Sequence, residues 1–194
     1  MAVAFPISAG QKLTAAVINH QYSIADTAVT TVTAAGPTSS NLSTVYVIPA
    51  SDAAVGMAYR LTCGGDGQQG STRQTLRFDV GFGGTSVGFG VIIDTTALAV
   101  SATFRWTATI MLIPITIGGS ATLNNMISGC VTQAANNLIP GTAANNTIPF
   151  GGANITATTG DSTVANNFAL RFQWGSTTGA PTITNRSTIF ERIG

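Results

Sequence analysis

The amino-acid sequence predicts an all-β protein built as an antiparallel sandwich or barrel. In the stretch 103–113, threonine and arginine fill the odd positions up to Thr109, and the even positions are apolar, namely Phe104, Trp106, Ala108, Ile110 and Leu112. Such alternation places the apolar side chains on one face of an extended strand. Runs rich in Thr, Val, Ile, Phe and Tyr recur to the end of the chain and are separated by Gly, Asn, Ser and Pro. Many short strands of this kind are typical of sandwiches and barrels.

Individual strands follow from the same pattern. They are expected near 26–34, 42–49, 56–63, 73–82, 86–94, 102–113, 123–133, 153–159, 167–174 and 184–193. The alternation of the opening stretch is repeated in 76–82, 87–93 and 168–174. Gly83-Gly84 fits a tight hairpin turn, and Pro114, which has no N–H to donate, is expected to end regular pairing.

Composition narrows the classes of function. The chain has 194 residues, a mass of 19.7 kDa, a net charge of +1 and only 8% charged residues, where roughly 25% is usual. No apolar run approaches the roughly 20 residues of a membrane span, and the start MAVAFPIS has no features of a signal peptide. The absence of basic runs argues against a nucleic-acid partner. So few charges indicate that partners cover part of the surface, and we expect an oligomer.

Residues 1–25 differ from the rest and are expected to form an N-terminal arm ahead of a β domain at 26–194. Leu13, Val17 and Ile18 have helical spacing, and Ser8 or Thr14 is suited to cap a short helix over about 13–22. A helix this short needs to dock on something. We expect these three side chains to attach the domain to a partner, the alternative being that the arm folds back on its own domain.

The sequence gives little support for catalysis. His20 is the only histidine, it lies in the arm, and no GxSxG motif is present. A carboxylate pair for glycoside hydrolysis would have to come from Asp66, Asp79, Asp94, Asp161 and Glu191. An ion pair with Arg77 is the simpler explanation of Asp79, and Asp66 and Asp161 lie in glycine-bearing turns where aspartate is common. No acidic loop has calcium-binding spacing. No catalytic, cofactor-binding or metal-binding residue is therefore predicted.

Four arginines, Arg60, Arg77, Arg105 and Arg171, fall on the outward-facing positions of their predicted strands. They are either ordinary solvated side chains on an outer sheet face or residues of a subunit interface. Arginine is preferred over lysine at interfaces because its planar guanidinium is less strongly hydrated. The chain has one lysine and seven arginines, which favours the interface.

The two cysteines, Cys63 and Cys130, are far apart in sequence and belong to no CxxC or Cys/His cluster. Two free thiols are expected, with a disulfide between them as the alternative. Cys63 follows the apolar series Met57, Tyr59 and Leu61, which places it on a core face.

The segment FPISAGQKLTAAVINHQY, residues 5–22, resembles the N-terminal segment of minor tail proteins of phages of actinobacteria. In those proteins a small residue followed by Gly-Gln leads into a short Leu-Thr-Ala-Ala helix that ends near Asn. The rest of the chain is similar to their jelly-roll domain in its Thr/Ala/Gly-rich strands and its terminal strand with Phe190-Glu191-Arg192-Ile193. The resemblance implies a trimeric jelly-roll sandwich, attached to the particle through its N-terminus and without enzymatic activity. Similar domains also occur as head fibres and capsid decorations.

We therefore expect a non-enzymatic structural protein of the virion, made and assembled in the host cytoplasm, that forms a homotrimer and contacts other tail or capsid proteins. The alternative is a carbohydrate-binding module or host-surface adhesin, and a small hydrolase is a third, weaker alternative. Recognition of a host glycan would use the loops expected at 64–71 and 134–154, where Asn145, Asn146 and Phe150 are the candidate residues. No cofactor, nucleic-acid or membrane partner is expected.

Overall fold

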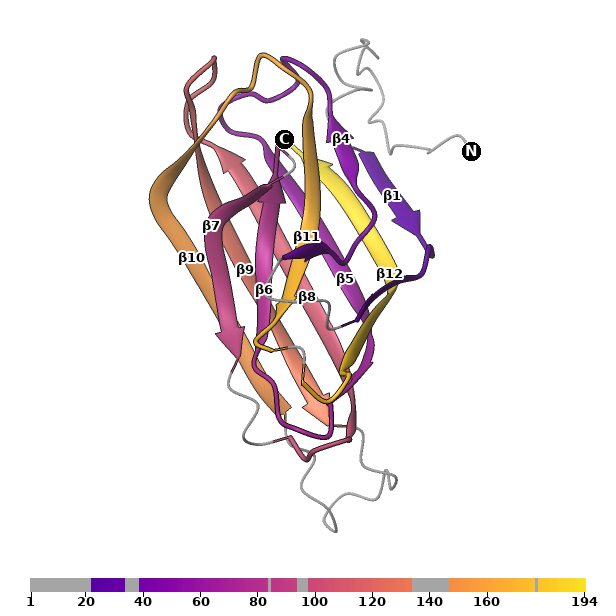
Figure 1. Cartoon of the computed structure of the whole chain (residues 1–194). Helices are drawn as coiled ribbons and strands as arrows, with labels where there is room; N and C mark the ends of the chain where they lie inside the picture. Colours follow the sequence, from indigo (N-terminus) through magenta and orange to yellow (C-terminus); the bar gives the residue numbers. More distant parts are fainter. Residues whose placement is uncertain (1–21, 34–38, 84, 94–97, 134–146, 177) are drawn as a thin grey trace.

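The computed structural model describes residues 22–33, 39–83, 85–93, 98–133, 147–176 and 178–194. Within these ranges the chain forms twelve β-strands and no helix. The strands build two antiparallel sheets that face each other as the two layers of a sandwich (Figure 1). The predicted all-β sandwich is confirmed.

The larger sheet has seven strands, and the smaller has five. The larger sheet contains β1 (Tyr22–Asp26), β2 (Thr30–Thr33), β5 (Ala58–Gln68), β8 (Thr103–Pro114), β9 (Ala121–Gln133), β10 (Thr147–Gly160) and β12 (Thr182–Ile193). The smaller contains β3 (Ser40–Asn41), β4 (Tyr46–Ile48), β6 (Leu76–Phe82), β7 (Thr85–Ile93) and β11 (Asn166–Trp174).

The strands pair in the nested order of a jelly roll. The last strand, β12, pairs with β1 and β2, and the one before it, β11, pairs with β3 and β4. Inside these pairs, β5 pairs with β8 and β6 pairs with β7. The chain thus alternates between the two sheets as it winds inward and out again, as in the jelly roll that the resemblance implies. The strands β9 and β10 are an added pair that extends the larger sheet beyond β8.

The inner faces of the two sheets form one hydrophobic core, as the alternation predicts. The apolar positions of β8 are all at most 2% exposed, and the corresponding positions of β6 and β11 are also buried. Phe78 of β6 is the centre of an aromatic cluster, with ring centroids 5.5 Å from Trp106, 5.1 Å from Phe172 and 5.0 Å from Phe150. Because aromatic rings bury large areas, this cluster holds the two sheets together.

Four predicted segments differ from the structure. The strand expected at 42–49 is only the short β4, Tyr46–Ile48, preceded by the two-residue β3. The single strand expected at 26–34 is two strands, β1 and β2, on either side of residues 27–29. The loop expected at 64–71 is wrong for its first half, because β5 continues to Gln68. The irregular segment expected at 134–154 is a strand from Thr147 onward, so Phe150 lies in β10 and not in a loop.

The glycines of β5 led to the prediction of a loop, because glycine is normally uncommon in strands. At Gly65 a Cβ would overlap the carbonyl oxygen of Thr184, and at Gly67 it would collide with the ring of Phe104. The neighbouring strand and the core therefore require glycine at both positions, and the strand persists through them.

Both cysteines are free thiols, as expected. Cys63 is 2% exposed on the inner face of β5, whereas Cys130 lies opposite Thr107 on the outer face, with Sγ and Oγ1 3.4 Å apart. The two side chains are thus on opposite faces of one sheet, which excludes a bond between them in this fold. Burial raises the pKa of the Cys63 thiol to about 12.

Candidate functional site

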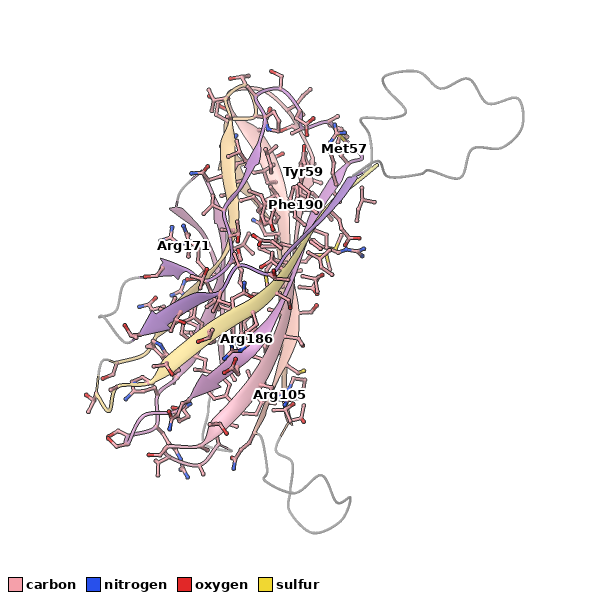
Figure 2. All side chains as sticks on the ribbon, turned by 90° about the vertical axis from the view of Figure 1, so that its right-hand side faces the viewer. Met57, Tyr59, Arg105, Arg171, Arg186 and Phe190 are labelled. Atoms are coloured by element: carbon pink, nitrogen blue, oxygen red, sulfur yellow. The ribbon has the colours of Figure 1, made fainter. Side chains whose placement is uncertain are left out.

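The four predicted interface arginines occupy the outer faces of both sheets. Arg60 and Arg105 lie on the larger sheet, and Arg77 and Arg171 on the smaller one, so the sandwich separates them into two pairs. Figure 2 shows Arg171 on one side of the molecule and Arg105 near its lower end, beside Arg186. The outward orientation predicted for all four is confirmed, since none is buried. Their role at a subunit interface stays a prediction.

On the larger sheet, Arg60 is held by Glu191 of the neighbouring strand. Its Nε donates to Glu191 Oε2 at 2.6 Å, and this hydrogen bond raises the pKa of the guanidinium. Arg60 lies opposite Met111, which lies opposite Met126. We call the apolar area around this row, comprising Met111, Ile113, Met126 and Ile189, the methionine patch; Met126 is 44% exposed and Ile189 41% exposed.

On the smaller sheet, Arg77 and Arg171 flank one buried carboxylate. Arg77 Nε donates to Asp79 Oδ1 at 2.7 Å, which confirms the predicted ion pair, and Asp79 is 1% exposed. Arg171 lies opposite Asp79 in the register of β6 and β11, and its Nη2 donates to the carbonyl oxygen of Ser39 at 2.5 Å. Its aliphatic stem covers Gly81, where a Cβ would come within 2.8 Å of it. Both arginines therefore serve contacts within the chain.

Arg105 is different, because it lies beside an open hollow in the larger sheet. The hollow has a volume of about 440 Å³ and is lined by Gly64, Gly65, Asp66, Arg105, Arg186 and Ser187. Asp66 lies directly opposite Arg105 in the register of β5 and β8. Arg186 donates to both carboxylate oxygens of Asp66, through Nε to Oδ1 and through Nη2 to Oδ2 at 3.1 Å. These bonds raise the pKa of the Arg186 guanidinium.

A β-bulge in β12 brings Arg186 to this hollow. The register of β12 against β5 shifts between Asn185 and Ser187, so that Arg186 is the extra residue. Before the bulge Ile183 and Asn185 face the core, and after it Thr188 and Phe190 do. A bulge redirects side chains in this way. Arg186 was not among the residues predicted from the sequence, although the break in alternation between Ile183 and Phe190 was a signal of the bulge.

A row of hydroxyl-bearing side chains runs across the larger sheet on both sides of the hollow. On one side of the hollow, Arg105 lies opposite Thr132, which lies opposite Thr147 on the next strand. On the other side, Asp66 lies opposite Thr184, which lies opposite Thr31. The hydroxyls of Thr132 and Thr147 are 3.0 Å apart, as are those of Thr31 and Thr184. The hollow is therefore the charged centre of a polar band that crosses the sheet.

The candidate carboxylates do not gather at one place in the described part of the chain. Asp66 and Asp79 are paired with arginines on different sheets, and Glu191 is paired with Arg60. Asp161 accepts hydrogen bonds from the backbone and hydroxyl of Thr163, which lower the pKa of its carboxyl group. Asp94 and His20 lie outside the described residues.

A buried ion pair at the other end of the larger sheet was also missed. Arg192 is on the inner face, 6% exposed, and its Nη2 is 2.8 Å from Asp52 Oδ1. The hydroxyl of Tyr59 donates to Asp52 Oδ2 at 2.8 Å. Burial and this hydrogen bond raise the pKa of the Tyr59 phenol. The network ties the connection between β4 and β5 to the last strand, which is a structural role.

Of the predicted attachment and recognition residues, Phe150 alone is described. Its ring is half-buried and stacks on Phe78 at an interplanar angle of 6°, so it contributes to packing between the sheets. Asn145 and Asn146 lie outside the described residues, as do Leu13, Val17 and Ile18 and the helix expected around them. The last residues of the proposed arm, from Tyr22, belong to β1.

Comparison with protein-family models, with curated proteins and with solved structures found no match to the chain. Among the residues that the structure describes, no helix is long and apolar enough to cross a membrane. The same ranges bring no three His, Cys, Asp or Glu side chains together at a spacing that would hold a metal ion. Inferences about function therefore rest on two areas of the outer face of the larger sheet, namely the methionine patch and the hollow beside Arg105.

Proposed function

We propose that this chain is a non-enzymatic structural protein of a phage particle, a homotrimer attached through its N-terminal arm to other tail or capsid proteins. The observation that supports it best is the methionine patch. This area on the outer face of the larger sheet exposes apolar side chains, above all Met126 and Ile189, and the charges in its row, Arg60 and Glu191, neutralise each other within the chain. Such a surface is suited to burial against another copy of the chain, because no unpaired charge has to be desolvated.

Two further features support the role on a particle. The jelly-roll topology agrees with the fold that the resemblance to phage minor tail proteins implies, although this fold hosts many functions. The segment that carries the resemblance, residues 5–22, runs up to β1, an edge strand of the larger sheet that pairs with β12 at Tyr22 and Arg192. The attachment segment is thus joined to the sandwich at one end of the larger sheet.

Deletion of the arm tests the attachment. A chain lacking residues 1–21 retains β1, whereas a deletion to residue 25 would remove most of that strand. We expect the full chain, tagged after Gly194, to co-sediment with purified phage particles. The chain lacking 1–21 should keep its β-sheet circular-dichroism spectrum and stay in the supernatant. Equal co-sedimentation of both chains, or absence of the full chain from particles, would contradict the proposal.

The alternative function is a carbohydrate-binding module or host-surface adhesin. One observation favours it, namely that the hollow beside Arg105 is open to solvent and combines charged groups with hydroxyls. Aromatic residues, on which neutral sugars commonly stack, do not line this hollow. Any recognition of saccharides there would depend on charge.

A further inference from the structure

We propose that the hollow lined by Gly64, Gly65, Asp66, Arg105, Arg186 and Ser187 binds an acidic saccharide through the carboxylate of a sugar unit. The inference does not depend on the proposed role in a phage particle. Its failure would leave the attachment of the arm untouched, and the reverse also holds.

The hollow is built into the fold. Its floor includes Gly64, whose outward-facing position, opposite Thr107, carries no side chain to fill it. Gly65 also lines the hollow, but its own Cβ position faces the core, where the carbonyl oxygen of Thr184 leaves no room for a Cβ. The bulge in β12 places Arg186 at the edge of this depression. Bulges commonly place side chains at functional sites in this way.

The charges around the hollow favour an anionic ligand. The hollow carries two guanidinium groups and one carboxylate, and Asp66 is already engaged by Arg186. Arg105 is exposed, and within the described ranges it makes no hydrogen bond or ion pair. A guanidinium presents up to five N–H donors in a planar fork that matches a carboxylate. An incoming carboxylate would find Arg105 free and the outer N–H groups of Arg186 beside it.

The size of the hollow and the side chains around it suit a saccharide. The hollow, at about 440 Å³, falls within the range of small-molecule sites and is much larger than a single inorganic anion needs. The hydroxyl of Ser187 lines it, and the threonine row continues across the sheet from both Arg105 and Asp66. These hydroxyls are suited to hydrogen-bond the hydroxyls of a sugar. With a net charge of +1, the chain lacks the positive field that a nucleic acid would require.

The test uses tri-galacturonic acid, its methyl ester and inorganic sulfate, with the full chain in low-salt buffer. We expect the acid to bind with a Kd of about 1 mM, as is reasonable for one exposed charged contact. The Nε–Hε signal of Arg105 should shift in the NMR spectrum. The methyl ester should bind at least about tenfold more weakly, because it keeps the ring and loses the charge-assisted hydrogen bonds.

Three variants locate the site. Arg105→Gln should weaken binding of the acid about tenfold. Arg60→Gln makes the same change in net charge on the same sheet face, about 20 Å along the strand from Asp66, and should bind like the parent chain. Asp66→Asn removes the competing carboxylate and should tighten binding.

Four results would overturn the proposal. They are no binding of the acid at 10-fold the expected Kd, equal binding of the methyl ester, equal effects of the substitutions at Arg105 and Arg60, and sulfate binding as tightly as the acid. The last would show a simple anion site in place of a saccharide site.

Discussion

The two faces of the larger sheet are built from the same strands and differ in what constrains them. On the inner face of β8, each apolar residue is packed against the smaller sheet and is at most 2% exposed. On the outer face, the same strand carries Thr103, Arg105, Thr107 and Met111, which are exposed or half-buried. The inner face therefore determines the stability of the fold, and the outer face is available for contacts with other molecules. Substitutions should separate these two roles.

The largest expected effect is on the inner face. Trp106 packs against Phe78 and donates from Nε1 to the carbonyl oxygen of Thr184 at 3.2 Å. Trp106→Ala should lower the free energy of unfolding by about 3–5 kcal/mol, through lost burial and a residual cavity. The matched control is Thr109→Ala, a half-buried position on the outer face of the same strand, with an expected change below about 1 kcal/mol. Urea denaturation measures both, and similar losses would show that the outer face also carries the fold.

A second test compares two arginine–carboxylate pairs on opposite faces. Arg192→Met leaves the Asp52 carboxylate without its buried partner and should cost about 2–4 kcal/mol, less than a fully buried pair because Asp52 keeps some contact with solvent. Arg60→Met removes the exposed partner of Glu191 and should cost less than about 1 kcal/mol. Thermal unfolding of the two variants at neutral pH ranks them. The reverse order would contradict the assignment of the Arg192 network to the structural framework.

The pH dependence of stability should also reflect the inner face. Burial raises the pKa of the Cys63 thiol to about 12, and burial likewise raises that of the Tyr46 phenol to about 12. Both groups keep their protons in the folded state when the unfolded chain has begun to lose them. Their contribution is therefore fully present below about pH 9 and is lost as the pH rises toward 12. Each group lowers stability by up to about 1.4 kcal/mol per pH unit in its window.

Cys63→Ala should reduce the slope of the unfolding free energy against pH in this alkaline range by the equivalent of about one proton. This change in slope is expected whatever the substitution does to stability at pH 7. Cys130→Ala, on the outer face, should leave the slope as it is. Unfolding free energies at pH 9, 10 and 11 provide the slopes. An unchanged slope in the variant lacking the Cys63 thiol would contradict the burial of that thiol.

The sequence predicted the inner face well and the outer face poorly, for a physical reason. Burial imposes strict alternation, so the core residues of β6, β8 and β11 could be identified from local pattern alone. The hollow depends on pairing between residues far apart in sequence. Asp66, Arg105 and Arg186 come together only because β5 lies between β8 and β12, and no local signal specifies that order.

Glycine and arginine produced the individual errors. Gly65 and Gly67 looked like loop residues, but close approach of neighbouring atoms requires glycine within the strand. Arg192 follows Phe190 at inner positions beyond the bulge, and charge alone gives no indication that the partly exposed Asp52 will pair with it. Tertiary contacts override the local preference in both cases.

The central claim is that the methionine patch is where copies of this chain meet. Light scattering on the purified full chain at micromolar concentration tests it most directly. We expect a mass about three times the 19.7 kDa of the chain, and Met126→Glu should convert it to a folded monomer, because a buried unpaired carboxylate is costly. Val47→Glu, which replaces a residue 56% exposed on the smaller sheet, should leave the trimer intact. A monomer mass for the parent chain, or a trimer that survives Met126→Glu, would contradict the account.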